Sequence, residues 1–311
     1  TKAVPILQVK DPRLAMSRIS AQFYDNPSEK MNIVGITGTN GKTTTTELVA
    51  AMLKQNQRST IAAGNIGTPL CAVADQSRDL DVLTLEVSSF QLETIDSFRP
   101  NIAVLLNLAP DHLDRHGSME NYIRAKARLF ENQEPFDRAI IQWDAWQELQ
   151  TLGIKISSKV VTFSATDNAA DLHLDRSLLI SRLPGWTGPI LDFEECQLDG
   201  HHNAENLLAA LLVGRAMNLT INEMLPAMRG FKSGPHRCEL IAEQGGVKYY
   251  NDSKATNVHA LCSALRTMPP AGDPKNIWLI AGGQDKALDF HAAGSDVGQR
   301  VKGAYLLGET S

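Results

Sequence analysis

One stretch constrains the fold more than any other: "GITGTNGKTTTTELV" (residues 35–49) places a glycine-rich turn between a short apolar strand and a helix. It nearly matches the phosphate-binding pattern G-x-x-x-x-G-K-[ST], except that Ile36 stands where the first glycine belongs. Such a turn presents backbone N–H groups and a positive helix N-terminus to phosphate oxygens. Lys42 would neutralise phosphate charge, and the Thr43 hydroxyl would reach Mg²⁺. The alternative is a strand-to-helix turn with incidental glycines, but G-K-T between a strand and a helix favours a phosphate site.

Apolar strands alternate with helices along the first half of the chain. Strands are expected at the sequences "MNIVGIT", "STIAAGNIGTPL", "DLDVLTLEVSS", "NIAVLLNLAPDHLDRHG" and "RAIIQW". Helices are expected at "TTTTELVAAMLKQN" and from Ser118 to about Glu131. This alternation predicts the α/β class, with a doubly wound, mainly parallel sheet. Ligands of such sheets lie beyond the carboxyl ends of the strands, where the polar sequences of this chain fall.

The chain divides into three expected segments. Residues 1–30 read as a linker with one amphipathic helix, and residues 31–233 as a central domain that carries the glycine loop. Within the central domain, residues 155–200 predict a small antiparallel excursion of short strands. A Gly-Pro pair then opens a second, partial α/β domain of the Rossmann type, residues 234–311, with a helix from about Asn257. Because that domain stops on a strand, we expect a C-terminal truncation.

Composition narrows the class of protein. The net charge is −5 and the chain has no lysine/arginine run, which disfavours nucleic acid as the main partner. The four cysteines have no C-x-x-C spacing, so neither a disulfide framework nor a zinc site is expected. No apolar run approaches the ~20 residues that span a bilayer, and no signal peptide is visible. We expect a monomeric cytoplasmic enzyme with no membrane partner.

Two charged residues stand in apolar surroundings. Glu86 ends a buried strand, where a carboxylate near a phosphate loop is a natural Mg²⁺ ligand; the alternative is a solvated strand terminus. Lys126 lies one helical turn from Tyr122 and Ile123, on the apolar face of its helix. A buried ammonium is costly, so this lysine is paired, deprotonated or modified, unless its stem packs while the charge reaches water.

Other polar sequences follow the predicted strands. "DHLDRHG" (residues 111–117) offers His112 and two aspartates, although alone it reads as an ordinary polar loop. "HNAENLLAALLVGRAMN" predicts a helix with Asn203 and Asn206 on one face of its first turn, where two amides could read a base edge. "NDSKATN" and "GGQDKALDF" each present a lysine after a strand and are expected to face the phosphate loop.

Six of these motifs, in this order and spacing, resemble the Mur ligase family: "GITGTNGKTTT", "LEVSSFQLE", "NLAPDHLDRHGSMENYIRAKARLF", "HNAENLLAA", "GPHRCELI" and "NDSKATN". The resemblance runs from about residue 31 to residue 311, and the family's loop has the shorter T-G-T-N-G-K-T form. Members are ATP-dependent amide ligases of peptidoglycan precursor synthesis. "EVSSFQLE", "NDSKATN" and "GGQDKALDF" look most like the member that adds D-glutamate to a UDP-sugar–alanine substrate.

The resemblance implies a role for each matching position. It implies ATP, two Mg²⁺ sites and a CO₂-derived carbamate on Lys126 as cofactors. The implied catalytic residues are Lys42, Lys126 and His112. Implied ATP contacts are Gly38, Thr39, Asn40, Gly41, Lys42, Thr43 and Thr44 in the loop, with Asn203, Asn206, Arg237 and Asp252 elsewhere. Implied metal ligands are Thr43, Glu86, His112 and carbamylated Lys126. Implied substrate contacts are Asn65, Ser88, Lys254, Thr256 and Lys286.

Three departures from the family pattern bear on substrate. Thirty residues are too few for the family's N-terminal UDP-binding domain, and "DPRLAMSRISAQFYDNPSEK" looks more like the linker of the ligase that adds the third amino acid. The usual Asn/Asp-rich stretch after the central strand reads "QWDAWQE", so no role is assigned to it. The chain also ends before the family's serine-containing loop. A different Mur-type ligase, a folate polyglutamate ligase and a non-catalytic nucleotide-binding module remain alternatives.

Overall fold

The computed structural model describes residues 9–23, 31–73, 75–268, 273–283 and 289–308. Its centre is a nine-stranded sheet in the order β2-β3-β1-β4-β5-β6-β7-β8-β9. All neighbouring pairs from β2 to β7 are parallel, and only β8 and β9 are added antiparallel. The strands are β1 (Asn32–Thr37), β2 (Thr60–Gly64), β3 (Val82–Glu86), β4 (Ile102–Leu105), β5 (Arg138–Gln142), β6 (Lys159–Ser164), β7 (Leu172–Asp175), β8 (Leu178–Ser181) and β9 (Gly188–Asp192). The predicted α/β class and mainly parallel sheet are confirmed.

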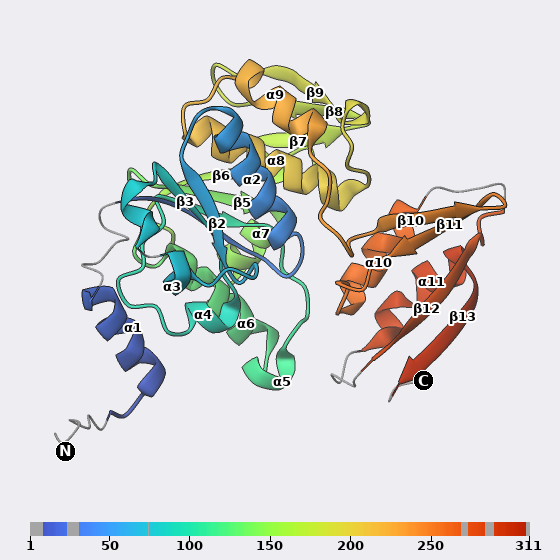
Figure 1. Cartoon of the computed structure of the whole chain (residues 1–311), viewed down its shortest axis with the longest axis horizontal. Coiled ribbons are helices and arrows are strands. Elements are labelled where there is room, and N and C mark those ends of the chain that lie inside the picture. Colours follow the sequence, from blue (N-terminus) through green and yellow to red (C-terminus); the bar gives the residue numbers. More distant parts are fainter. Residues whose placement is uncertain (1–8, 24–30, 74, 269–272, 284–288, 309–311) are drawn as a thin grey trace.

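Helices cover both faces of the sheet, as Figure 1 shows. The longer ones are α2 (Lys42–Gln55), α6 (Met119–Ala127), α7 (Trp143–Thr151), α8 (His201–Ala216) and α9 (Ile221–Gly230). Side chains of β1 alternate between two buried clusters: Val34 and Ile36 pack with Leu48 of α2, whereas Ile33 packs with Ile123 of α6. Because both faces are buried, the strands are apolar throughout rather than alternating.

The chain order brings three strand ends together. β1 lies between β3 and β4: the connection after β1 leads to β2 on one side, whereas the connection after β4 leads to β5 on the other side. In a doubly wound sheet this reversal opens a crevice at the carboxyl ends of the strands. The loops that follow β1, β3 and β4 therefore meet, and they carry the glycine loop, the sequence after Glu86 and the "DHLDRHG" sequence.

Residues from Glu239 onward form a second group of elements, at the right of Figure 1. We call it the C-terminal lobe. It contains an antiparallel hairpin, a parallel strand pair and helices. Its elements are β10 (Glu239–Gln244), β11 (Val247–Asn251), α10 (Val258–Thr267), β12 (Ile277–Gly283), the 3-10 turn η5 (Phe290–Ala293), α11 (Gly294–Arg300) and β13 (Val301–Gly308).

Several local expectations need correction. The antiparallel excursion expected within residues 155–200 is present from β7 to β9, but β6 and β7 first extend the parallel sheet. The helix expected to run to Glu131 ends at Ala127 and continues as the 3-10 turn η3 (Arg128–Phe130). Helices α7, α9 and α11 were not predicted from the sequence. The remaining elements are α1 (Pro12–Phe23), α3 (Leu70–Val73), η2 (Gln76–Asp79), α4 (Ser89–Leu92), α5 (Leu113–His116) and η4 (Phe193–Glu195). In the part of the chain that the structure describes, no helix has the length and apolar character needed to cross a membrane.

Candidate active site

The glycine loop is fixed in place by the segment that follows β4. Thr39 N–H donates to the carbonyl of Asn107 at 3.1 Å, and Asn40 N–H donates to Asn107 Oδ1 at 2.8 Å. The Thr39 hydroxyl lies 3.1 Å from the carbonyl of Ala109 and 3.0 Å from the hydroxyl of Tyr122, and it accepts from Ala109 N–H at 2.9 Å. These bonds fix the loop at the N-terminus of α2, the arrangement that suits a phosphate group.

Lys42 folds back over this loop. Its Nζ donates to the carbonyls of Gly38 and Thr39, at 3.0 and 2.9 Å. Burial lowers the Lys42 pKa, while the carboxylates of Glu86 and Asp111 act to raise it. The Lys42 ammonium thus lies against the turn, close to the carboxylates of Glu86 and Asp111. When a phosphate group binds, the ammonium can leave the two carbonyls and donate to phosphate oxygens instead.

Glu86 is a buried carboxylate, 3% exposed, with both oxygens engaged. Oε2 accepts from the Thr43 hydroxyl at 2.7 Å, and Oε1 accepts from Asn65 Nδ2 at 2.8 Å. The alternative of a solvated strand terminus is therefore wrong. A carboxylate and a hydroxyl in contact at a phosphate loop are oxygen ligands of the kind that Mg²⁺ prefers, so Thr43 and Glu86 fit one cation.

Lys126 is buried, 2% exposed, and its charge does not reach water. Its Nζ donates to the carbonyl of Gly38 at 2.8 Å and lies 4.7 Å from the centre of the Tyr122 ring. The Lys126 pKa is lowered well below its usual value, first by burial and then by the positive charge of Lys42, against Asp111 and Glu86. The structure therefore excludes the solvent-reaching alternative. Two lysines share one carbonyl, and an anion in place of the Lys126 ammonium would relieve their repulsion.

The "DHLDRHG" loop brings a second carboxylate to the site. Asp111 is 8% exposed, and its Oδ1 accepts from His112 N–H at 3.0 Å. His112 has a left-handed backbone, φ 53°, and its ring lies 4.8 Å from that of Phe90. Its Nε2 is 3.7 Å from Asp111 Oδ2. Among the described residues, no three His, Cys, Asp or Glu side chains gather into a metal-holding group.

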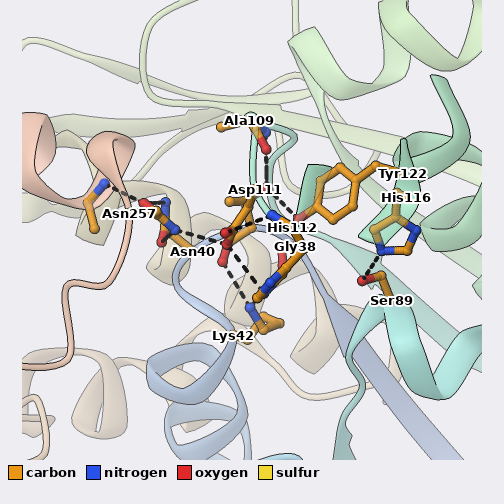
Figure 2. A network of polar contacts seen from close by, with 12 residues as sticks. Gly38, Asn40, Lys42, Ser89, Ala109, Asp111, His112, His116, Tyr122 and Asn257 are labelled. Atoms are coloured by element: carbon orange, nitrogen blue, oxygen red, sulfur yellow. Dashed lines mark hydrogen bonds and ion pairs between the residues drawn. The ribbon is translucent and has the colours of Figure 1, made fainter. Parts of the chain in front are cut away.

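A buried histidine supports the loop after β3. His116 Nε2 lies 3.0 Å from the Ser89 hydroxyl (Figure 2), and its Nδ1 lies 3.4 Å from Glu93 Oε1. Burial lowers the His116 pKa, against the opposing effect of the Glu93 carboxylate. Ser88 caps α4 with its side chain, which accepts from Gln91 N–H. These contacts fix the position of the segment that contains the predicted substrate residue Ser88.

Asn203 and Asn206 lie on one face of α8, as predicted, but their amides are used inside the protein. Asn206 Oδ1 accepts from the Thr45 hydroxyl at 3.0 Å, and its Nδ2 donates to Asn203 Oδ1 at 3.1 Å. Asn203 Nδ2 donates to the carbonyl of Asp199 at 2.8 Å. Gly41 has φ 80°, and a Cβ there would collide with Asn206 Oδ1. In this arrangement Asn203 and Asn206 stabilise the start of α2. A contact between these two residues and adenine stays a prediction.

The C-terminal lobe supplies the remaining predicted residues. Asp252 Oδ1 accepts from Cys238 N–H at 3.1 Å, and burial raises the Asp252 pKa while nearby Arg237 lowers it. Lys254 and Thr256 are exposed on the segment between β11 and α10. Lys286 lies outside the described residues.

Four residues of the site were missed by sequence reasoning: Asn107, Asp111, Tyr122 and Asn257. Each touches the glycine loop or the loop after β4 through a hydrogen bond. Asp111 precedes His112 and Asn257 closes "NDSKATN", so both stood inside quoted motifs. The signal was present for these two. Tyr122 stands on the apolar face of its helix, and nothing in the sequence indicates that its hydroxyl reaches the glycine loop.

Known protein families, relatives and solved structures resemble this chain. Residues 36–214 match the sequence profile described as the Mur ligase middle domain, and residues 236–311 match that of the Mur ligase glutamate ligase domain. The chain is 40% identical, over 311 residues, to the UDP-N-acetylmuramoylalanine–D-glutamate ligase of Desulfitobacterium hafniense (strain Y51), covering 98% of this chain and 66% of the relative. It is 42% identical to the ligase of the same name from Acidobacterium capsulatum, covering 96% of this chain and 63% of the relative. The chain thus spans less than two thirds of the length of these relatives.

Solved structures share the fold at low identity. MurF from Acinetobacter baumannii superposes with a TM-score of 0.76 at 17% identity, covering 98% of this chain and 71% of that one. Folylpolyglutamate synthase from Mycobacterium tuberculosis, complexed with ADP, gives 0.74 at 17% identity, covering 95% and 78%. The two profile matches together account for most of the chain, and the resemblance inferred from the six motifs is confirmed: this chain belongs to the Mur ligase family.

Proposed function

We propose that the protein is an ATP-dependent, ADP-forming ligase that joins D-glutamate to the alanine carboxyl group of a UDP-N-acetylmuramoyl-alanine substrate. The relatives named D-glutamate ligases support the substrate class. One structural observation carries the chemistry: Lys42 and Lys126 converge on the carbonyl of Gly38, beside the buried Glu86. These two lysine side chains lie against a loop shaped for phosphate, where charge develops during phosphoryl transfer.

In the proposed reaction, an oxygen of the substrate carboxylate attacks the γ-phosphorus of ATP, and the bond to ADP breaks. The acyl phosphate that results is attacked at carbon by the amine of D-glutamate. The amine loses a proton, phosphate leaves, and an amide remains. Lys42 holds the transferred phosphoryl group, while Lys254, Thr256 and Lys286 are proposed to hold the carboxylates of the amino acid.

The residues of the loop fit a magnesium ion. Thr43 and Glu86 would hold one Mg²⁺, and His112 with Lys126 as its carbamate would hold a second. A bound Mg²⁺ neutralises phosphate charge and orients the phosphates. The low pKa of Lys126 supports carbamylation, because CO₂ reacts with a neutral amine. The resulting anion would lie beside the Lys42 ammonium.

Amino-acid-dependent phosphate release tests this function. With Mg²⁺-ATP and UDP-N-acetylmuramoyl-L-alanine, we expect D-glutamate to stimulate release by the full-length protein, and L-glutamate to have no effect. Stimulation by a diaminopimelate or by folate with L-glutamate would instead support one of the related ligases. ATP binding without any amino-acid stimulation would support a non-catalytic nucleotide-binding module.

We also propose that function follows the predicted division of the chain, with ATP bound mainly by residues 31–233, Arg237 and Asp252 as further contacts, and the amino acid bound by residues 234–311. The exposed position of Lys254 and Thr256 supports this assignment. The glycine loop and these two residues come from different sides of that division. Closure of the two parts would therefore assemble the site and exclude water from the acyl phosphate.

A further inference from the structure

The side chain of Asn40, in the middle of the glycine loop, is turned toward the C-terminal lobe. Its Nδ2 lies 3.4 Å from Asn257 Oδ1 and 2.7 Å from His259 Nδ1. Its Oδ1 accepts from Asn257 Nδ2 at 3.2 Å. Both ends of this amide are thus engaged by the start of α10. The phosphate loop and the lobe are thus joined through Asn40, which is one of the loop residues that the resemblance assigned to ATP.

Asn257 also reaches the loop after β4. Its Nδ2 donates to Asp111 Oδ2 at 3.1 Å, and Asn257 itself is 8% exposed (Figure 2). The other oxygen of Asp111 accepts from His112 N–H. A single buried amide therefore touches the loops that follow β1 and β4, the two strands between which the crevice opens. A hydrogen bond from an amide to a carboxylate is stronger than one between neutral groups.

Lys254 and Thr256, which are predicted to bind D-glutamate, lie on the segment that ends at Asn257. It is the N-cap of α10, and its Oδ1 accepts from Ala260 N–H at 2.8 Å. Thr256 is its neighbour and Lys254 lies three residues before it. The bonds to Asn40 and Asp111 therefore set the distance between that segment and the phosphate loop.

We infer that Asn257 is a positioning residue, which holds the amino-acid segment in register with the phosphate loop through Asn40 and Asp111. This inference rests on the proposed function, in which the amine must meet an acyl phosphate formed at the loop. Small displacements of reacting groups cost large factors in rate. Asn257 acts on the chemistry through these two partners and through the residues that precede it.

Asn257 could serve only as a helix cap, and two substitutions separate the roles. Serine and aspartate both cap helices well. Asn257→Ser keeps a cap but is too short to bridge to Asn40 and Asp111. Asn257→Asp keeps the cap and the length but loses the N–H donor and sets two carboxylates against each other.

The test measures kcat, the KM for ATP and the melting temperature of the full-length protein. We expect both variants to lower kcat for D-glutamate-dependent phosphate release by about 10- to 100-fold, as loss of a hydrogen bond to a charged group implies. The KM for ATP should change by less than about threefold, because the loop itself is intact. Combining Asn257→Asp with Asp111→Asn restores a donor and an acceptor, and should give a higher kcat than Asn257→Asp alone.

Two results would overturn the inference. One is wild-type kcat in both single variants. The other is a loss of activity in Asn257→Ser that is matched by a loss of stability, which would show that the cap alone matters.

The junction can be tested even if the protein is no D-glutamate ligase. If the wild type shows no amino-acid stimulation, the proposed function fails, and small-angle scattering then decides the junction. With an ATP analogue and Mg²⁺, Asn257→Asp should have a larger radius of gyration than the wild type. An unchanged radius in that variant would mean that the amide does not hold the lobe to the loop.

Discussion

At the scale of single residues, the site is organised by two buried lysines that meet at one backbone carbonyl. Lys42 belongs to the loop itself, whereas Lys126 arrives from α6 on the other face of the sheet. Burial lowers the pKa of both lysines, the charge of Lys42 lowers that of Lys126 further, and nearby Glu86 and Asp111 compensate only in part. A carbamate on Lys126 would turn this repulsion into attraction and supply oxygens for a cation.

Replacing Lys126 by alanine should lower phosphate release by at least about 100-fold, the typical cost of losing an electrostatic stabiliser. Added formate or acetate should restore part of the activity, because a carboxylate can fill the vacated space. Lys159→Ala, at the exposed start of β6, is the control and should be neutral. Folded Lys126→Ala protein that short carboxylates leave inactive would contradict the carbamate.

A substitution at Gly41 tests how tightly the glycine loop packs against α8. Gly41→Ala should cost about 2–4 kcal/mol in the free energy of unfolding, from the left-handed backbone plus the collision with Asn206. Gly153→Ala is a matched control, because Gly153 has φ 66° and no atom within 4 Å of its would-be Cβ. That control should cost only about 1 kcal/mol. Equal losses in denaturant titrations would mean that Asn206 yields freely.

At the scale of elements, β5, α7 and α8 meet around a carboxyl group that the sequence did not mark. Gln142 Nε2 donates to Asp144 Oδ2 at 3.0 Å and to Glu205 Oε1 at 3.2 Å. The pKa of Glu205 is raised to about 7, chiefly by burial and in smaller part by Asp144, while the bond from Gln142 acts to lower it. Gln142 also caps α7, since its side chain accepts from Ala145 N–H.

Glu205 should make the protein less stable as the pH rises. Its folded pKa lies above its unfolded value, so the folded state binds the extra proton, and stability is lost as the pH rises from about 4.5 to about 7. Glu205→Gln should therefore gain about 1–3 kcal/mol over the wild type at pH 8 and lose this pH dependence. Glu194→Gln, on the exposed turn η4, is the control. Denaturant titrations at pH 5 and pH 8 measure the difference, and parallel curves for Glu205→Gln and the wild type would refute it.

At the scale of the whole molecule, polar side chains connect the central elements with the C-terminal lobe. Besides the junction at Asn257, His202 of α8 lies 3.3 Å from the hydroxyl of Thr267 in α10. Burial lowers the pKa of His202 to about 4, helped by His259 and His201. The arrangement of the lobe thus depends on a histidine that stays neutral.

Acidification should loosen this contact. The folded state keeps His202 neutral while the unfolded chain protonates near pH 6.5, so stability present above that pH is lost as the pH falls toward 4. Between pH 6.5 and pH 5 we expect His202 to contribute a loss of about 1–2 kcal/mol, opposed by the gain from Glu205, so this contribution is measured as the difference in slope between His202→Asn and the wild type. His291→Asn, on the exposed turn η5, should follow the wild type. The same slope in His202→Asn and the wild type would contradict the role of His202.

The sequence predicts the central sheet well because strands buried on both faces read as apolar runs, as β1, β3 and β4 do. It fails at β6 and β7, whose short, half-polar sequences look the same in a parallel extension as in an antiparallel hairpin. The helix α7 was missed because it starts directly after β5 with no breaker between them. Motifs identified Lys42, Glu86 and Lys126, but the fact that Lys42 and Lys126 share the Gly38 carbonyl depends on two helices packing from opposite faces. No local pattern encodes that.

The whole proposal depends on the loop from Gly38 to Thr44 binding the phosphates of ATP next to Lys42 and Lys126. A crystal structure with Mg²⁺ and a non-hydrolysable ATP analogue, grown with bicarbonate, would show where the phosphates bind. We predict that the β- and γ-phosphates lie in this loop, that Lys42 Nζ has left the carbonyls of Gly38 and Thr39, and that density extends beyond Lys126 Nζ. Phosphates bound elsewhere, with the loop empty and Lys42 still on those carbonyls, would contradict the claim.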